Sequence, residues 1–166
     1  TVCWVLDICN AKVNDSCGFH VHMDAAGFNL DTWKNLTLTY KHLEHLIDAF
    51  MPRTRRNNTY CKTLSGVSDE RIKSVRTIDG LREVFNNDRY HKVNFEAYSR
   101  HRTVEFRQHS GTTNFTKMEN WIRFLNGLIT FAKRSSLPSR MTLEELPFLD
   151  GKQKLFFKLR TKKLAV

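Results

Sequence analysis

Two short segments, residues 17–24 and 102–112, constrain the fold most, because apolar residues alternate in them with polar, ion-binding ones. Such alternation is typical of β-strands, in which side chains at positions i and i+2 share a face and lie roughly 7 Å apart. In the first segment, His20, His22 and Asp24 would therefore point to one face of a strand. Their apolar neighbours would point to the opposite face, toward a core.

The second segment presents a carboxylate, a guanidinium and an imidazole at the same spacing, on Glu105, Arg107 and His109. A carboxylate and an imidazole are suitable ligands for Mg²⁺ or Mn²⁺, and an arginine can hold a phosphate or a carboxylate through two hydrogen bonds. This combination suits phosphoryl transfer, in which a metal ion and an arginine neutralise developing charge. Gly111 would let the backbone approach a ligand closely. A His-x-His pair alone is more often structural, so the predicted site depends on both segments together.

The composition indicates one domain that favours anionic partners. A chain of 166 residues can bury a sizeable core and usually forms a single domain, here 1–166. Its 27 Lys and Arg residues outnumber 17 Asp and Glu residues, and the net charge of +10 favours nucleotides, nucleic acid or acidic peptides. No stretch approaches the ~20 apolar residues that span a bilayer, and no secretory leader is recognisable. We therefore expect a cytoplasmic protein with reduced cysteines and no membrane partner.

The apolar periodicity predicts an α+β fold, in which an antiparallel sheet packs against helices. The expected strands span residues 1–9, 17–24, 90–98 and 103–108, and a turn at 99–102 joins the last two.

Helix signals lie between and after these strands. A long helix should begin near Asn29 and end before Pro52, and short helices should span 68–76 and 77–86. Two further helices should open with capping boxes, at Thr116 with Glu119 and at Thr142 with Glu145. Residues 151–166 are expected to form a basic C-terminal tail.

Three motifs in combination resemble the amidoligase family. They are Ser-Cys-Gly-Phe-His-Val-His-Met-Asp at 16–24, Arg-Asn-Asn-Thr-Tyr-Cys at 56–61 and Thr-Val-Glu-Phe-Arg-Gln-His-Ser-Gly-Thr at 103–112. The resemblance extends over residues 14–135. This family, common in phages and in some fungi and bacteria, is similar to glutamine synthetase and glutamate–cysteine ligase. The resemblance therefore implies a fold like the C-terminal part of their catalytic domains.

The resemblance also implies an ATP-dependent ligase that joins a carboxylate to an amine through an acyl-phosphate. ATP and Mg²⁺ (or Mn²⁺) would be its cofactors, and small-molecule or peptide carboxylates and amines its substrates. By motif, His20 and Glu105 would bind the metal. Glu105 and Arg107 would be the catalytic residues, with Arg107 gripping the substrate carboxylate or the acyl-phosphate. The residues expected at the nucleotide phosphates are His22, Arg53, Arg56 and Arg102.

One part of the superfamily pattern is missing. A strand with a Glu-x-Glu pair should precede the His-x-His strand, but residues 1–16 contain only Asp7 and Asp15 as acids. We therefore expect the chain to lack the N-terminal strands of the domain. Either an N-terminal partner chain completes the site, or the chain is truncated or degenerate and inactive alone.

Two other classes of function remain open. His20-Val21-His22 also has the His-hydrophobic-His form of metal-dependent DNA-nicking endonucleases, in which Tyr60 or Tyr90 would attack the DNA. The net charge of +10 would suit that substrate. The third possibility is a non-catalytic, basic nucleic-acid-binding or structural module on a ligase-like fold.

Overall fold

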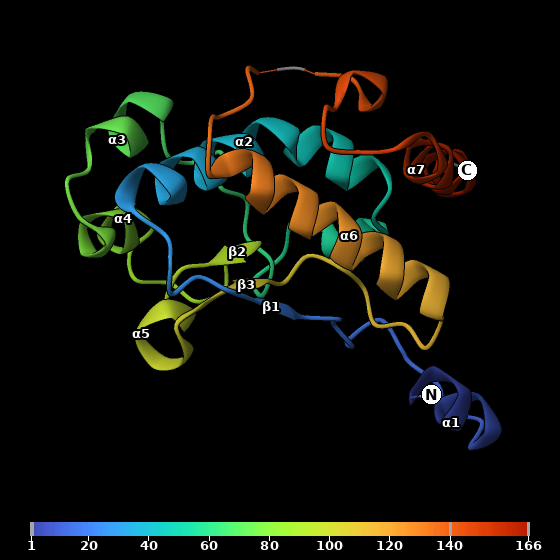
Figure 1. Ribbon diagram of the computed structural model, residues 1–166. Coiled ribbons are helices and arrows are strands. Elements are labelled where there is room, and N and C mark those ends of the chain that lie inside the picture. Colours follow the sequence, from blue (N-terminus) through green and yellow to red (C-terminus); the bar gives the residue numbers. More distant parts are fainter. Residues whose placement is uncertain (1, 140, 166) are drawn as a thin grey trace.

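The computed structural model describes residues 2–139 and 141–165, and it has the α+β fold that the sequence predicts (Figure 1). Within these residues, seven α-helices accompany one three-stranded sheet. The α-helices are α1 (Val2–Ile8), α2 (Leu30–Ala49), α3 (Asp69–Ser74), α4 (Ile78–Val84), α5 (Ala97–His101), α6 (Phe115–Ala132) and α7 (Gly151–Leu164). The strands are β1 (Val21–Asp24), β2 (Val93–Asn94) and β3 (Thr103–Phe106), and the 3₁₀ helices are η1 (Arg53–Arg55) and η2 (Leu143–Glu145). None of the described helices is both long and apolar enough to cross a membrane.

The sheet has the strand order β1-β3-β2, and both pairings are antiparallel. Because β3 lies in the centre, its residues can have cross-strand neighbours on both sides. Glu105 of β3 lies opposite His22 of β1 and opposite Asn94 of β2. The register therefore places one carboxylate between an imidazole and an amide.

Helix α2 covers the apolar face of this sheet, and α6 packs beside α2 (Figure 1). Val104 and Phe106 of β3 are fully buried, and the Phe106 ring lies 5.8 Å from the ring of Tyr40 on α2. Burying each such side chain stabilises the fold by roughly 1.5–3 kcal/mol. Because side chains alternate along a strand, this packing directs Glu105 to the face opposite α2.

The starts of the two long helices show which capping predictions were correct. Asn29 caps α2 through its side chain, as the sequence predicts. Helix α6 begins after Asn114, whose side chain accepts a backbone hydrogen bond in the first turn. The capping box predicted at Thr116 and Glu119 is therefore wrong, because the helix has already begun at these positions.

The C-terminal region is also helical. The capping box at Thr142 and Glu145 is present, but it opens only the short helix η2. Helix α7 begins after Asp150 and occupies most of the segment expected to be a basic tail. Its Phe157 is buried, with the ring centroid 4.4 Å from that of Phe50, so apolar packing holds this basic helix on the core. Val166 lies outside the described residues.

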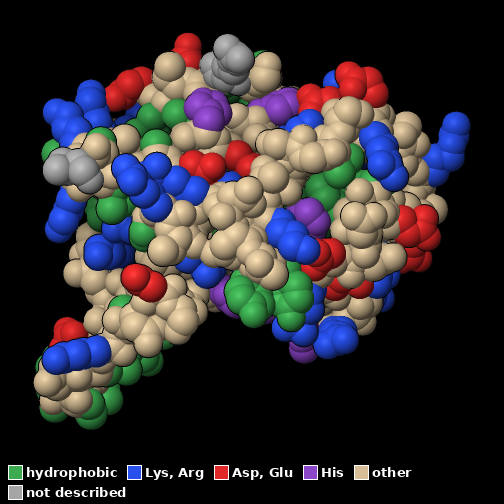
Figure 2. Space-filling model, turned by 180° about the vertical axis from the view of Figure 1, so that it is seen from behind, with side chains coloured by type: hydrophobic (Ala, Val, Ile, Leu, Met, Phe, Trp, Pro, Cys, Tyr) green, Lys and Arg blue, Asp and Glu red, His purple; other side chains and the backbone are tan. Residues whose placement is uncertain are grey.

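The N-terminal segment forms helix α1, so the strand expected at 1–9 is wrong; Thr1 lies outside the described residues. Backbone hydrogen bonds such as that from Cys9 N to Val5 O (2.9 Å) satisfy the polar groups of the segment locally. The helix projects from the body of the molecule and carries apolar side chains on its surface (Figure 2), including Trp4 at 66% exposure.

The strand expected at 90–98 is reduced to the two residues of β2. The side-chain Oδ1 of Asn94 accepts a hydrogen bond from the backbone N–H of Glu96 (2.9 Å), which turns the chain out of the sheet. Helix α5 then replaces the turn expected at 99–102. It ends at Arg102, which adopts the left-handed conformation with φ 57°.

Candidate functional site

The candidate site is centred on the carboxylate of Glu105. Its Oε1 atom lies 3.0 Å from Nδ1 of His20, 2.8 Å from Nη1 of Arg107 and 3.7 Å from Nε2 of His22. Its Oε2 atom accepts a hydrogen bond from Nδ2 of Asn94 (2.6 Å). The structure thus brings together four of the six polar residues that the two sequence segments presented.

The other two polar residues of these segments are placed elsewhere. The exposed Asp24 accepts the backbone N–H of Ala26 (3.0 Å). The ring of His109 is buried against Phe19 and Trp121.

The local backbone explains how His20 reaches Glu105. The segment before β1 runs beside the segment after β3, where the backbone N–H of Phe19 donates to the carbonyl oxygen of His109 (2.9 Å). At Gly18, an added methyl group would lie 2.6 Å from Nε2 of His20 and 2.9 Å from Nη2 of Arg55. A residue without a side chain therefore leaves the space that both side chains occupy.

The surroundings of Glu105 favour its ionised form. Burial by itself would raise the pKa of Glu105, but hydrogen bonds from His20 and Asn94 and the charge of Arg107 outweigh it. Together they lower the pKa of Glu105 from 4.5 to about 2. The site therefore holds a carboxylate anion at neutral pH, ready to accept a cation.

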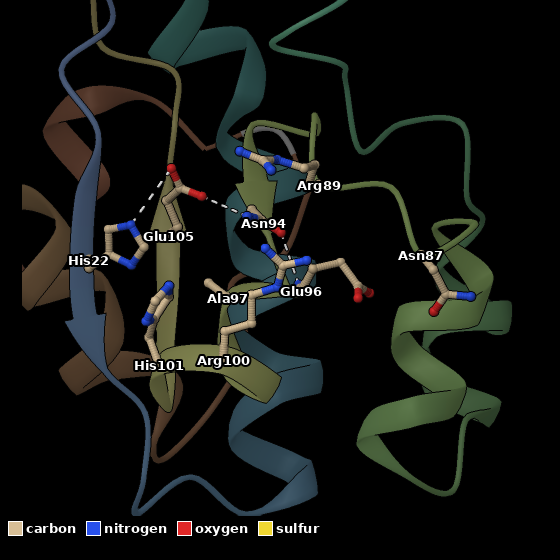
Figure 3. Close-up of a pocket in the computed structure, with 9 residues that line it drawn as sticks. All are labelled: His22, Asn87, Arg89, Asn94, Glu96, Ala97, Arg100, His101 and Glu105. Carbon is tan, nitrogen blue, oxygen red and sulfur yellow. Dashed lines mark hydrogen bonds and ion pairs between the residues drawn. The ribbon is translucent and has the colours of Figure 1, made fainter.

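A polar cavity of about 250 Å³ opens beside Glu105 (Figure 3). His22, Asn94 and Glu105 line one side of it. The other lining residues come mostly from the loop before β2 and from α5, and they include Arg89, Glu96, Arg100 and His101. His101, expected in a turn, lies on α5 with its ring centroid 5.8 Å from that of His22.

Sequence reasoning missed Asn94, Arg89 and Arg100 as residues of this site. Residues 90–98 were expected to form one long strand, whereas the structure has only β2 followed by α5, so the expected pattern did not place them. An asparagine opposite Glu105 could have been found only by pairing the expected strands in register, which requires knowing where β2 ends.

None of the three arginines expected at the nucleotide phosphates lines the cavity beside Glu105. Arg53 is exposed on η1, and Arg56 donates from Nε to the carbonyl oxygen of Met51 (3.1 Å). The guanidinium of Arg102 lies 4.9 Å from the centroid of the Tyr98 ring. Among the described residues, no ion pair or hydrogen bond joins any of these three guanidinium groups to Glu105.

Arg55, which was not predicted, is the arginine of η1 that reaches the site. Its side chain is 5% exposed, and it donates to the carbonyl oxygens of Gln108 and Arg107. Arg55 thus ties η1 to the backbone that follows β3. Its guanidinium stabilises the position of Arg107 through these contacts.

Gly111 has a structural role, and the ligand contact that was expected of it stays a prediction. Its backbone N–H donates to the carbonyl oxygen of Cys17 (2.7 Å), and an added methyl group would lie 2.5 Å from Cβ of Cys17. Gly111 therefore permits the close approach of the two site-bearing segments.

Two residues could bind a metal ion directly, namely His20 through its imidazole and Glu105 through its carboxylate. Over residues 2–139 and 141–165, no group of three or more His, Cys, Asp and Glu side chains is arranged to hold a metal. Mg²⁺ is commonly held by one or two carboxylates and completes its shell with water and phosphate oxygens. His20 and Glu105 fit a metal ion bound in that manner.

The motifs on which this site depends also match a known family. A protein-family model described as "Putative amidoligase enzyme" matches residues 4–129, which include both site-bearing segments. The family resemblance of the motifs is thereby confirmed. No curated protein and no solved structure matches the chain significantly. Because the family model covers most of the sequence, this chain belongs to the amidoligase family.

Proposed function

We propose that this chain is an ATP-dependent ligase that forms an amide bond between a carboxylate and an amine through an acyl-phosphate. The observation that carries the proposal is the convergence of His20, His22 and Arg107 on the ionised carboxylate of Glu105. A carboxylate, imidazoles and a guanidinium in contact are the groups that a metal-assisted phosphoryl transfer requires. Membership of the amidoligase family supports the same chemistry.

The proposed reaction has two steps. A carboxylate oxygen of the substrate attacks the γ-phosphorus of ATP, and the bond from that phosphorus to ADP breaks. The nitrogen of the amine then attacks the acyl carbon, inorganic phosphate leaves with the electrons of the C–O bond, and the nitrogen loses a proton. The products are an amide, ADP and phosphate.

Each residue has a proposed role in this scheme. Glu105 and His20 would hold Mg²⁺ or Mn²⁺, which when bound would neutralise charge on the transferred phosphoryl group. Arg107 would orient the substrate carboxylate or the acyl-phosphate. His22, whose Nδ1 lies 2.8 Å from Oγ1 of Thr103, has its ring held toward the cavity and would contact phosphate oxygens. Arg53, Arg56 and Arg102, which are not bonded to Glu105, would contact other phosphate oxygens of the nucleotide.

The proposed metal site is tested by titrating the protein with Mn²⁺ in a calorimeter, because this readout requires no substrate. Glu105→Gln should weaken binding at least tenfold, since an amide lacks the charge of the carboxylate. Glu119→Gln, on the outer surface of α6, is the matched control and should bind as the unaltered protein does. Equal affinity in both variants would contradict the metal assignment.

The ligase step is tested by incubating the protein with Mg²⁺, ATP, hydroxylamine and a panel of carboxylic acids. An acyl-phosphate reacts with hydroxylamine to give a hydroxamate, so the product should appear together with ADP and only when a suitable acid is present. Absence of hydroxamate with every acid tested would contradict the proposal.

One observation favours the endonuclease alternative. Tyr60 is 61% exposed, its ring lies 5.4 Å from that of Tyr90, and the guanidinium of Arg107 lies 5.6 Å from the Tyr90 ring. A tyrosine nucleophile could thus lie near the metal residues. A nicking enzyme would form a covalent adduct with single-stranded DNA that Tyr60→Phe or Tyr90→Phe abolishes. Nucleic-acid binding that survives Glu105→Gln would instead indicate a non-catalytic module.

A further inference from the structure

The cavity beside Glu105 has more positive charge than its own acids can neutralise. Glu105 already pairs with Arg107 (2.8 Å), and Glu96 pairs with Arg82 (2.5 Å). Both oxygens of Glu96 accept hydrogen bonds from Arg82, so this carboxylate has little capacity left for a ligand. The charges of the two acids that line the cavity are thus already balanced by arginines outside its lining.

Two other arginines line the same cavity and have no such partner. Within the described part of the chain, neither Arg89 nor Arg100 forms an ion pair. They come from different elements, the loop before β2 and the last turn of α5. Figure 3 shows both guanidinium groups directed toward Asn94, the residue that holds Glu105. Two cationic groups therefore face one small space.

The size of the cavity restricts what these arginines can bind. Its volume of about 250 Å³ is below the roughly 300–1,000 Å³ of pockets that enclose drug-sized ligands. The cavity would enclose a short organic acid, whereas a whole nucleoside triphosphate would extend beyond it. A guanidinium recognises a carboxylate through paired, charge-assisted hydrogen bonds.

We propose that Arg89 and Arg100 select a small acid with two negative charges, a dicarboxylate of a few carbon atoms. One carboxylate would lie toward Glu105 and Arg107, and the other would be held by Arg89 and Arg100. The assignment of the first carboxylate as the reacting one rests on the proposed ligase function. The preference for a dianion rests only on the charges and size of the cavity.

Calorimetric titration with defined acids tests this inference without any catalysis. Succinate and glutarate are compared with butyrate and valerate, in buffer that contains Mg²⁺ but no ATP. Low ionic strength is used because salt screens exposed arginines. The dicarboxylates should bind about tenfold more tightly than the monocarboxylates. Absence of dicarboxylate binding, or equal binding of both classes, would overturn the inference.

Substitutions assign the preference to the two arginines. Arg89→Gln and Arg100→Gln should each weaken glutarate binding about fivefold to tenfold, and the double variant should lose the preference for dicarboxylates. Arg123→Gln is the matched control, because Arg123 lies on the outer surface of α6 and pairs with Glu119. Circular dichroism establishes that each variant is folded. Unchanged glutarate binding in the double variant would contradict the role of these arginines.

Phosphate is the other common source of paired negative charge, so pyrophosphate and ADP form a second arm of the titration. If these bind in an Arg89-dependent and Arg100-dependent manner while the dicarboxylates do not, the cavity is a phosphate site and the inference is wrong. The hydroxamate assay is independent of these titrations. If no hydroxamate forms but the protein still binds dicarboxylates selectively, only the proposed ligase function is contradicted.

Discussion

Asn94 donates a hydrogen bond from Nδ2 to Oε2 of Glu105 across the β2–β3 pair, over 2.6 Å. The orientation of the Asn94 amide is fixed independently, because its Oδ1 accepts the backbone N–H of Glu96 (2.9 Å). The amide therefore occupies one oxygen of Glu105 and leaves the other facing His20. Asn94 thus orients the carboxylate that we propose as a metal ligand.

Asn94→Ala should weaken Mn²⁺ binding about tenfold, because residues that orient a ligand contribute affinity on this scale. Loss of the donor should also move the pKa of Glu105 upward, since a hydrogen bond to the ionised form is removed. Calorimetry measures the affinity, and ¹³C NMR of the labelled carboxyl group follows its titration. Asn120→Ala, at a half-buried position on α6 whose side chain donates to the carbonyl oxygen of Thr116 (2.9 Å), should change neither quantity. If Asn94→Ala and Asn120→Ala had the same Mn²⁺ affinity and the same pKa of Glu105, Asn94 would have no orienting role.

A buried ion pair stabilises the opposite side of the sheet. Lys92 is completely buried, and its Nζ lies 3.1 Å from Oε2 of Glu44 and 2.7 Å from Oδ1 of Asp48 on α2. The carbonyl oxygen of Lys92 also accepts the backbone N–H of Arg107 (2.8 Å). Lys92 therefore links α2 to the backbone that carries the site.

Lys92→Met should destabilise the protein by about 3–5 kcal/mol, because it leaves two acids without their buried cation. Lys62→Met is the matched control. Lys62 pairs with Asp88 at 2.5 Å, but its side chain is 42% exposed, and pairs of this kind contribute about 0–1 kcal/mol. Urea denaturation measures both free energies of unfolding. Equal losses in the free energy of unfolding of the two variants would mean that the ion pairs of Lys92 contribute no more than a solvent-exposed pair.

His109 makes the stability of the fold depend on pH. The centroid of its ring lies 5.7 Å from the ring centroids of both Phe19 and Trp121. Burial lowers the pKa of His109 from 6.5 to about 4, and the charges of Arg160 and Lys117 act in the same direction. The unfolded chain takes up a proton near pH 6.5, which the folded protein does not accept until about pH 4. Between these values the unfolded state binds more protons, so stability falls as the pH is lowered.

His109→Gln should remove this part of the pH dependence, on the order of 2 kcal/mol between pH 7 and pH 4.5. Urea denaturation at the two pH values gives the change for each protein. His45→Gln, at an exposed histidine on α2, should retain the full dependence. A pH dependence in His109→Gln as large as that of the unaltered protein would contradict the assignment.

The central part of the site could be predicted because alternation along a strand is a local property. Polar residues at every second position indicated that Glu105 and Arg107 share a face, and the apolar residues between them indicated a core on the other side. The same reasoning failed at residues 1–9, since a short apolar run is equally compatible with a helix that satisfies its own backbone groups.

The remainder of the site depends on how distant segments meet. Arg89 lies on an irregular loop and Arg100 at the end of a short helix, and neither position follows from periodicity. Arg55 reaches the site because η1 folds back on the segment after β3, whereas its neighbours Arg53 and Arg56 do not. Tertiary contacts therefore decide which basic residue of a cluster approaches the site, and sequence spacing does not contain that information.

The close approach of Gly111 to Cys17 gives a test of how the two site-bearing segments are held together. In Gly111→Ala the new methyl group would lie 2.5 Å from Cβ and 3.1 Å from the carbonyl oxygen of Cys17. Because these contacts include backbone atoms of Cys17, the whole segment that leads to His20 would have to move away, at a cost in stability. We expect a loss of about 1–3 kcal/mol in the free energy of unfolding, together with weaker Mn²⁺ binding.

Gly66→Ala is the matched control, because an added methyl group there would have no neighbour within 4 Å. This substitution should leave Mn²⁺ binding unchanged and should keep or slightly raise stability, since alanine restricts the unfolded chain more than glycine does. Urea denaturation and Mn²⁺ calorimetry on both variants provide the comparison. If Gly111→Ala lost stability but kept its Mn²⁺ affinity, the packing at Cys17 would support the fold without positioning His20. If it lost neither, the two segments would not need their close contact.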